Sequence, residues 1–466
     1  MTPAVMAMHG WRIHALTGDD AWTIATAACA AVACAVLGCF LVLRRMSMLG
    51  DAISHAILPG IVAAFIITSS RGVLPMLVGA TVVGVLTAVF SRAIHRWGRI
   101  PEDAALGVVF TSLFALGVMM IAWVPRDVDL DPGCVLYGLL EFVSLDRVVV
   151  LGVEVPRALT WLAGTLLVVV GVVWAGYKEL KVVSFDPGLA ASLGISVALV
   201  HYVFLGMVAA TTVVSFEAVG SILVIVMLIA PAAAAHLLTD RLAAMIWISV
   251  ALAVSSSVVG YVLALWVDTS AAGMISVVSG GQFAAAMLLA PRHGLVSKAL
   301  GRAALAFRIS REDVLGILYR WHERRGRGDP GAPPTTREIS RAIGGAVLTQ
   351  LAVRSLRSRG LAQSDSGGLR LTEDGLRAAS GIVRSHRLWE TFLAQRLGLP
   401  VDHLHEPSHR VEHFITEDLQ RSLHRDLGTA TDPHGSEIPR SASSSSSPSS
   451  SPSSSPASDP RPGGVG

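Results

Sequence analysis

Between its first two long apolar runs the chain reads Leu43-Arg44-Arg45-Met46-Ser47-Met48-Leu49-Gly50-Asp51-Ala52-Ile53-Ser54-His55-Ala56-Ile57-Leu58-Pro59-Gly60. Asp51 and His55 are four residues apart, so a helix places their carboxylate and imidazole on one face. Both groups are ligands for Zn²⁺ or Mn²⁺. Pro59 cannot donate to the carbonyl of residue 55, which leaves a backbone oxygen beside the pair. The stretch therefore predicts a metal-binding pair, and the alternative is that Asp51 only caps the helix after Gly50.

The chain up to about residue 290 contains apolar runs that are long enough to cross a bilayer. About nine runs are present, at 21–43, 51–69, 73–93, 104–124, 158–176, 192–214, 217–238, 242–267 and 272–290. Segment 134–156 is apolar but interrupted by Glu141, Asp146 and Glu154, so a re-entrant or surface helix is one interpretation, and the segment is assigned to no span. Lys, Arg, Asp and Glu concentrate after about residue 290. We expect an all-α polytopic membrane protein followed by a charged soluble extension.

Loop charges predict the orientation of the spans. Basic residues follow every second span, namely Arg44, Arg45, Arg92, Arg96, Arg99, Lys178, Lys181, Arg241, Arg292 and Lys298. The intervening loops are acidic, as around Asp268. Because basic loops stay in the cytoplasm, we expect the N-terminus outside, the C-terminal half inside and a location in the plasma (inner) membrane.

Composition disfavours several classes of function. The net charge of +3 is too small to imply a nucleic-acid partner for the whole chain. The cysteines form no CxxC pair, which argues against a thiolate metal site. No nucleophile is paired with a base, so an enzyme is disfavoured. No G-x-x-x-x-G-K-[ST] loop occurs, so any ATP hydrolysis belongs to another polypeptide.

Two further features stand out in the apolar half. Glu217 is an ionisable residue in an apolar stretch, where it either lines a metal path or faces the outer aqueous turn. The polar loop 177–195 contains Ser184-Phe185-Asp186-Pro187, in which Asp186 or Ser184 can start a short helix that Gly194 ends. Such a cytoplasmic helix either docks on a soluble motor or is a plain connector.

The soluble half begins with a predicted helix, turn and helix. Thr335 and Glu338 form a capping box at the start of one helix, and a second helix runs from about Ala346 to Arg359. Residues 361–371, turning at 366–368, predict a two-stranded wing. Arg354 and Arg357 either contact DNA phosphates, form a solvated face or lie against anionic lipid.

Histidine and glutamate recur at helical spacing further on. His386 and Glu390 are four residues apart on the helix that Thr372 opens. His409, Glu412 and His413 share one face of another helix, and His405 is nearby. If the two helices pack together, these nitrogen and oxygen ligands predict a site for one or two divalent ions.

Residues 20–295 resemble the membrane subunits of the manganese, zinc and iron type of ABC importers. The likeness rests on residues 43–60, 102–107 (EDAALG), 184–187 (SFDP), 218–223 (AVGSIL) with Pro231, and 290–294 (APRHG). It implies a permease dimer, a separate ATPase that docks on loop 177–195, and an extracytoplasmic metal-binding protein. It also implies that Asp51 and His55 lie on the metal path.

Residues 310–440 resemble the metal-dependent repressors related to the diphtheria toxin repressor. The likeness rests on 383–393 (VRSHRLWETFL), 411–413 (VEH) and 432–439 (DPHGSEIP). It implies a metal-binding and dimerisation domain whose Mn, Fe or Zn ligands are His386, Glu390, His405, Glu412 and His413, with Asp313 as a contributor. His409 and Gly316 depart from the family pattern, which bears on the choice of metal.

We therefore expect a membrane-embedded permease for a divalent metal with a cytoplasmic metal-sensing module. The expected parts are an outer segment 1–20, a transmembrane domain 21–295, a winged-helix-like domain 305–372, a helical metal-binding domain 373–440 and a disordered Ser/Pro tail 441–466. The alternative is a membrane-tethered, metal-responsive transcription regulator.

Overall fold

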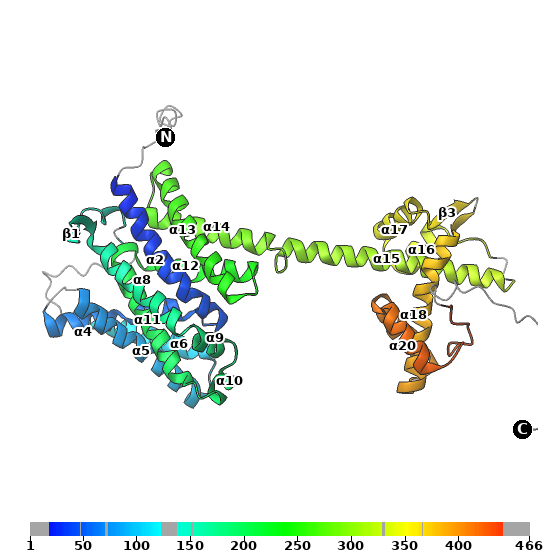
Figure 1. The fold of residues 1–466 in the computed structure, drawn as a ribbon, viewed down its shortest axis with the longest axis horizontal. Helices are drawn as coiled ribbons and strands as arrows, with labels where there is room; N and C mark the ends of the chain where they lie inside the picture. The colour runs from blue at the N-terminus through cyan, green and yellow to red at the C-terminus, as the bar shows by residue number, and fades with distance from the viewer. Residues whose placement is uncertain are drawn as a thin grey trace, which may run out of the picture. The chain divides into compact units, whose positions relative to one another are not determined.

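The computed structural model describes residues 18–46, 48–69, 73–122, 138, 140–150, 152–328, 331–365 and 367–440 (Figure 1). The chain divides into two compact units, Met1–Lys298 and Ala299–Gly466. The predicted Ser/Pro tail and nearly all of the predicted outer segment 1–20 lie outside the described residues. The two units are described in turn.

The first unit is a bundle of apolar helices. Within the described residues, nine helical segments are long and apolar enough to cross a membrane, which confirms the predicted fold class. The helices are α2 (Gly18–Leu43), α3 (Met48–Ala56), α4 (Leu58–Thr68), α5 (Val73–Gly98), α6 (Glu102–Ile121), α8 (Arg157–Ala175), α9 (Tyr177–Phe185), α10 (Pro187–Ser192), α11 (Val197–Val219), α12 (Ser221–Leu238), α13 (Leu242–Val267) and α14 (Ala271–Leu289).

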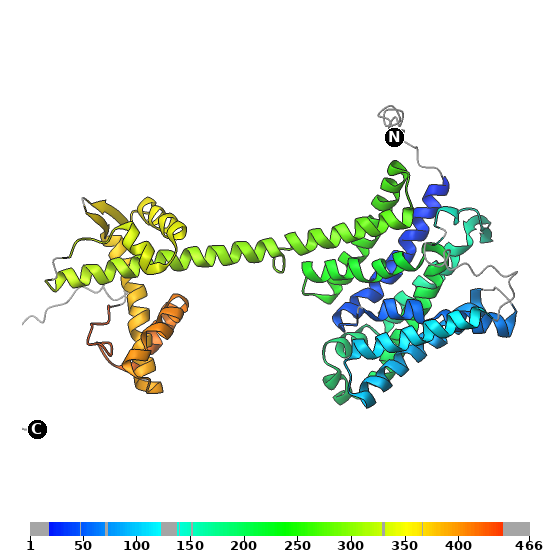
Figure 2. The same cartoon turned by 180° about the vertical axis from the view of Figure 1, so that it is seen from behind.

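Helix α2 runs through the middle of this bundle (Figures 1 and 2). It packs against α8 and α11 on one side and against α12 and α13 on the other. The approach to α12 requires a glycine, because a Cβ on Gly38 would lie 1.9 Å from the carbonyl oxygen of Leu228. The bundle core therefore depends on close backbone packing of small residues, as is usual between membrane helices.

The second predicted span is broken into two helices. Helix α3 ends at Ala56 and α4 begins at Leu58, with Ile57 between them. Pro59 lies in the first turn of α4, a position where its missing N–H costs nothing. The break separates the turn that carries Asp51 and His55 from the rest of the span.

Segment 134–156, which we assigned to no span, contains a short 3₁₀ turn and a hairpin in its described part. Turn η1 (Leu140–Phe142) precedes the antiparallel strands β1 (Arg147–Val150) and β2 (Val153–Pro156). Valine-rich sequence favours strands, and Gly152 at φ 83° supplies the turn. Glu141 accepts a hydrogen bond from the backbone N–H of Ala271, which attaches η1 to the start of α14 (Oε1 to N, 2.9 Å).

The second unit contains a helix-turn-helix, a wing and a helical metal-binding region. Its elements are α15 (Leu295–Gly326, which begins in the first unit), α16 (Thr336–Ile343), α17 (Ala346–Ser358), β3 (Ala362–Asp365), β4 (Gly368–Leu371), α18 (Glu373–Leu397), η2 (Val401–His403), α19 (His405–Val411), η3 (Glu412–Phe414) and α20 (Glu417–Leu427). The capping box of Thr335 and Glu338 is confirmed. The predicted wing is also confirmed, since β3 pairs with β4 in antiparallel register.

Candidate metal sites

Asp51 and His55 lie together on one face of α3. His55 Nε2 is 3.5 Å from Asp51 Oδ1, and the two side chains are 38% and 41% exposed, respectively. The opposite face of α3 is buried, because Ala52 and Ile53 enter the bundle core. The aromatic rings of Phe110 and Phe114 on α6 have centroids 6.2 and 5.9 Å from the imidazole. One chain thus offers two ligands on a half-exposed surface.

Glu217, the third residue predicted for the metal path, belongs to α11. Its side chain lies outside the part that the structure describes.

The predicted coupling loop forms two short helices. Ser184 and Phe185 end α9, and Asp186 caps α10 by accepting from the N–H of Leu189 at 3.0 Å, with Pro187 in the first turn. Of the two predicted N-caps, Asp186 is therefore the one observed. Phe185 is 59% exposed. The junction of α9 and α10 thus exposes the aromatic ring of Phe185 beside the carboxylate of Asp186.

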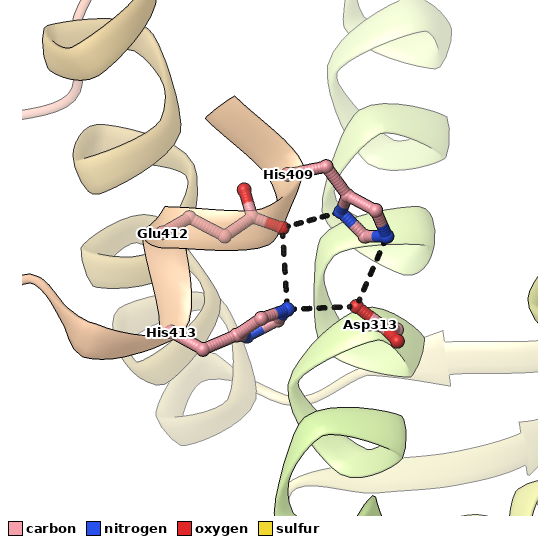
Figure 3. Close-up of side chains that lie close together, drawn as sticks. All are labelled: Asp313, His409, Glu412 and His413. Carbon is pink, nitrogen blue, oxygen red and sulfur yellow. Dashed lines mark hydrogen bonds and ion pairs between the residues drawn. The ribbon is translucent and has the colours of Figure 1, made fainter. Parts of the chain in front are cut away.

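Four side chains of the second unit converge to form what we call site 1 (Figure 3). Asp313 comes from α15, His409 from α19, and Glu412 and His413 from η3. His409 Nδ1 and His413 Nε2 lie 2.7 and 3.6 Å from Glu412 Oε1. The same rings lie 3.8 and 3.3 Å from Asp313 Oδ1 through their Nε2 atoms. Taking one nitrogen or oxygen from each residue, the four candidate ligand atoms all lie within 4.8 Å of one another.

Local backbone geometry explains part of this arrangement. We expected His409, Glu412 and His413 on one α-helix, but α19 ends at Val411 and tightens into the 3₁₀ turn η3. The three side chains nevertheless meet at one point, where Asp313 of α15 faces them. Burial completes the site: the side chains of Glu412 and His413 are 4% and 3% exposed.

A second cluster, site 2, lies beside the first. His386 and Glu390 are one turn apart on α18, with Nε2 and Oε1 at 3.0 Å. His405, at the start of α19, places Nδ1 3.2 Å from both Glu390 Oε1 and His386 Nε2. His386 and Glu390 are buried and His405 is exposed. Site 2 thus has two inner ligands and one at the surface.

Glu412 connects the two sites. Its Oε1 belongs to site 1, while its Oε2 lies 2.6 Å from Nδ1 of His386, whose other nitrogen belongs to site 2. A metal on either site would therefore orient a ligand of the other through this contact.

The carboxylates and imidazoles of both sites shift each other's pKa values toward the charged forms. Burial alone would raise the pKa of Glu412 and Glu390, but their histidine neighbours outweigh it and lower both pKa values. Burial alone would lower the pKa of His413, but Asp313 and Glu312 outweigh it and raise the pKa to about 9. The pKa of His386 is likewise raised by Glu390 and Glu412 against the effect of burial. Metal binding must therefore displace protons from imidazoles.

The donor set of site 1 fits a divalent transition metal. Asp313 Oδ1 is buried and makes no hydrogen bond among the described residues, although three other candidate ligands surround it. Two imidazoles and two carboxylates suit Mn²⁺, Fe²⁺ or Zn²⁺. A cavity of about 330 Å³ beside the site is lined by Asp313, His409 and Gly316, among others, and provides an approach for the ion.

Glu312 is a functional candidate that the sequence reasoning missed. Its Oε2 lies 2.8 Å from Nδ1 of His413, so it fixes the ring whose Nε2 enters site 1. A carboxylate behind a metal-binding imidazole is a common way to orient the ring. The only signal in the sequence was its position next to Asp313.

The residues predicted to contact DNA lie on an exposed face of α17. Arg354 and Arg357 are both exposed in its second half. The first half exposes Val347 and Leu351, which are 71% and 44% accessible. The exposed face of α17 therefore combines basic side chains, which can contact phosphates, with apolar ones, which can contact thymine methyl groups.

Comparisons with known proteins identify both parts of the chain. The profile of the ABC 3 transport family matches residues 21–290, and that of the iron dependent repressor, metal binding and dimerisation domain matches residues 372–440. Both resemblances inferred from the sequence motifs are thereby confirmed.

Individual relatives agree with the first match. The manganese transport system membrane protein MntD of Bacillus subtilis is 46% identical over 282 residues, covering 60% of this chain and 95% of that protein. The zinc transport system membrane protein TroD of Treponema pallidum is 35% identical over 274 residues, covering 59% and 75%. The structure of PsaBC from Streptococcus pneumoniae in complex with Fab matches with a TM-score of 0.51 and 29% identity, covering 59% of this chain and 94% of that one.

Proposed function

Because this chain belongs to the ABC 3 transport family through residues 21–290, we propose that it is the permease of an importer for a divalent transition metal, with Mn²⁺ as the first candidate. The observation that carries the proposal is the Asp51–His55 pair on the half-exposed face of α3. An ion in the bilayer needs polar ligands that lipid cannot supply. Mn²⁺ is favoured over Zn²⁺ and Fe²⁺ because the relative with 46% identity is a manganese system.

We expect a second copy of the chain to complete the path. A divalent transition metal takes at least four ligands, and one chain supplies two through Asp51 and His55. Two copies that face each other through α3 would supply two carboxylates and two imidazoles. Half-exposed ligands on the outside of one bundle, flanked by Phe110 and Phe114 of α6, support this arrangement.

Transport would be driven by a separate ATPase, since this chain has no phosphate-binding loop. We place the ATPase on the cytoplasmic surface of α9 and α10, where Phe185 and Asp186 are exposed. An aromatic side chain beside a charge is a typical anchor for a protein partner. An extracytoplasmic metal-binding protein would deliver the ion on the other side of the membrane.

The second unit would sense cytoplasmic metal and slow import. Sites 1 and 2 present seven nitrogen and oxygen ligands, which are His386, Glu390 and His405 with Asp313, His409, Glu412 and His413. Asp313 belongs to α15, the helix through which the chain leaves the permease, so metal binding acts directly on that connection. Occupancy can bias transport only if metal binds one state of this connection better than the other.

Reconstitution tests the proposed import. The full chain, its ATPase and the metal-binding protein are placed in vesicles, and uptake of Mn²⁺, Zn²⁺ and Fe²⁺ is followed with and without ATP. We expect ATP-dependent accumulation of at least one of these ions. Vesicles that accumulate none of them, although the ATPase assembles and hydrolyses ATP, would contradict the import function.

A membrane-tethered regulator of transcription is the second candidate. The helix-turn-helix of α16 and α17 with its wing, and the exposed Arg354 and Arg357, favour it. A gel-shift series on the full chain with Mn²⁺ decides, because a regulator binds one DNA sequence in a metal-dependent manner.

A further inference from the structure

Arg44 lies directly after α2 and turns back into the bundle. Its Nε donates a hydrogen bond to Ser184 Oγ at 3.0 Å, near the end of α9. The Ser184 hydroxyl itself donates to the carbonyl oxygen of Leu180 at 2.6 Å, so it has both a donor and an acceptor role. The guanidinium carbon of Arg44 is 4.6 Å from the ring centroid of Phe204 on α11. One side chain at the end of α2 thus contacts two other helices, α9 and α11.

The guanidinium of Arg44 has no acidic partner among the described side chains. Among the described residues, no carboxylate lies within ion-pair distance of Arg44, and its Nη2 is buried without a hydrogen-bond partner. Burial lowers the pKa of Arg44 to about 10, which still leaves the group charged at neutral pH. A half-buried charge whose Nη2 lacks a partner costs desolvation energy, so a purely packing role would be served better by an apolar side chain.

The contacts of Arg44 lie between the predicted motor surface and the metal path. On one side, α9 continues into α10, where Phe185 and Asp186 are exposed. On the other side, Phe204 packs edge-on against Phe40 of α2, with ring centroids 6.2 Å apart. Helix α11 also packs against α3, which carries Asp51 and His55. Arg44 thus adds a side-chain link between α9 and α11 to the direct packing of these two helices, and α11 in turn contacts α3.

We propose that Arg44 is a positioning residue that couples the motor to the path, by holding α9 to α2 and α11 through Ser184 and Phe204. The proposal rests on the proposed transport function. Arg44 makes this link through one hydrogen bond and one cation–π contact. Each of these interactions is weak enough to rearrange during a transport cycle. A salt bridge to a buried carboxylate would resist such a rearrangement.

The test separates ATP hydrolysis from metal movement. The permease is reconstituted with its ATPase, and the number of Mn²⁺ ions moved per ATP hydrolysed is measured for Arg44→Gln, Ser184→Ala and Ser184→Thr. We expect Arg44→Gln to lower this ratio about tenfold while ATP hydrolysis continues. Ser184→Ala should lower it less, since the contact with Phe204 remains, and Ser184→Thr should restore it because it keeps the hydroxyl.

Arg45→Gln is the matched control. Arg45 is the exposed neighbour with the same charge, and its left-handed φ of 58° strains arginine and glutamine alike. Its ratio should equal that of the wild type. A merely structural role for Arg44 would lower the melting temperature and reduce ATP hydrolysis and transport together. That result, or an unchanged ratio in Arg44→Gln, would overturn the proposal, whereas a wild type that moves no ion would instead contradict the import function.

Discussion

The two metal-binding regions of this chain differ in how firmly they can hold an ion. The pair on α3 supplies two ligands from one helical turn, and both side chains are about two-fifths exposed, at 38% and 41%. Sites 1 and 2 draw ligands from α15, α18, α19 and η3, and their central residues His386 and Glu412 are 5% and 4% exposed.

This difference follows from what each region must do with the ion. A path has to release its ion, so binding must be weak enough to allow exit. A sensor has to keep the ion for as long as its concentration stays high, and it gains affinity from buried, charged and mutually oriented ligands. On the proposed function, similar ligand chemistry would serve passage in one region and retention in the other.

Removal of the path ligands should have the largest effect. Asp51→Ala and His55→Ala should each lower Mn²⁺ uptake more than about 100-fold, because no described neighbour can replace a ligand on α3. Metal binding by sites 1 and 2 should be unchanged in the same proteins. Uptake is measured in vesicles and binding by equilibrium dialysis of the full chain.

His236→Ala is the matched control, since His236 is an exposed imidazole on another span, α12. Its uptake should equal that of the wild type. Equal uptake by Asp51→Ala and the wild type would remove the functional distinction between the two regions.

Glu412→Gln should have the next largest effect, and only in the sensor. The substitution removes a carboxylate ligand from site 1. It also removes the group that orients His386, a ligand of site 2, through Nδ1. Metal affinity should therefore fall by about 100-fold at both sites. Glu406→Gln is the control, because Glu406 is exposed on α19 and pairs only with Arg410 among the described residues. If Glu412→Gln weakened a single site, Glu412 would not connect them.

Glu312→Gln should have a smaller effect that is confined to site 1. Glu312 does not belong to either set of candidate ligands but orients His413, so we expect affinity at site 1 to fall about tenfold. Site 2 serves as the internal control. A competition titration with a metal indicator compares Glu312→Gln with the wild type. We expect weaker binding at site 1 and unchanged binding at site 2. A titration curve identical to that of the wild type would rule out the orienting role.

The smallest expected effect is a pH dependence of local stability. His413 has its pKa raised to about 9 in the folded, metal-free protein, mainly by Asp313 and Glu312 acting against burial. A raised pKa stabilises the fold fully below the unfolded value of about 6.5, and this contribution is lost as the pH rises through about 9.

Hydrogen exchange of α19 and η3, corrected for its intrinsic pH dependence, should therefore show easier opening between pH 6.5 and 9 in the metal-free chain. Over the same range Mn²⁺ affinity at site 1 should rise, because fewer protons compete with the ion. Corrected exchange that did not rise over this range, or an affinity that did not rise with it, would contradict the protonation of His413.

Much of the fold could be predicted from the sequence because its signals are local. Apolar length predicts the spans, and the Thr335–Glu338 capping box marks the start of α16. The break at Ile57 and the hairpin around Gly152 were not predicted, because short apolar stretches fit a helix, a strand or a kink equally well.

The sites could be predicted only as far as helical spacing reaches. Spacing groups His386 with Glu390 and His409 with Glu412, but the contact of Glu412 with His386 depends on how α18 packs against η3. Glu312 and Arg44 act through tertiary contacts with His413 and Ser184, which lie far away in the sequence. Such contacts leave no periodic pattern.

Uptake measured against internal metal tests the division between passage and retention most directly. Vesicles that contain the full chain and its partners are loaded with increasing Mn²⁺ on the cytoplasmic side, and initial uptake is compared between the wild type and Glu412→Gln. We expect uptake by the wild type to fall as internal Mn²⁺ rises, while uptake by Glu412→Gln stays constant. Two curves that fall together, or do not fall at all, would contradict a sensor that regulates the path.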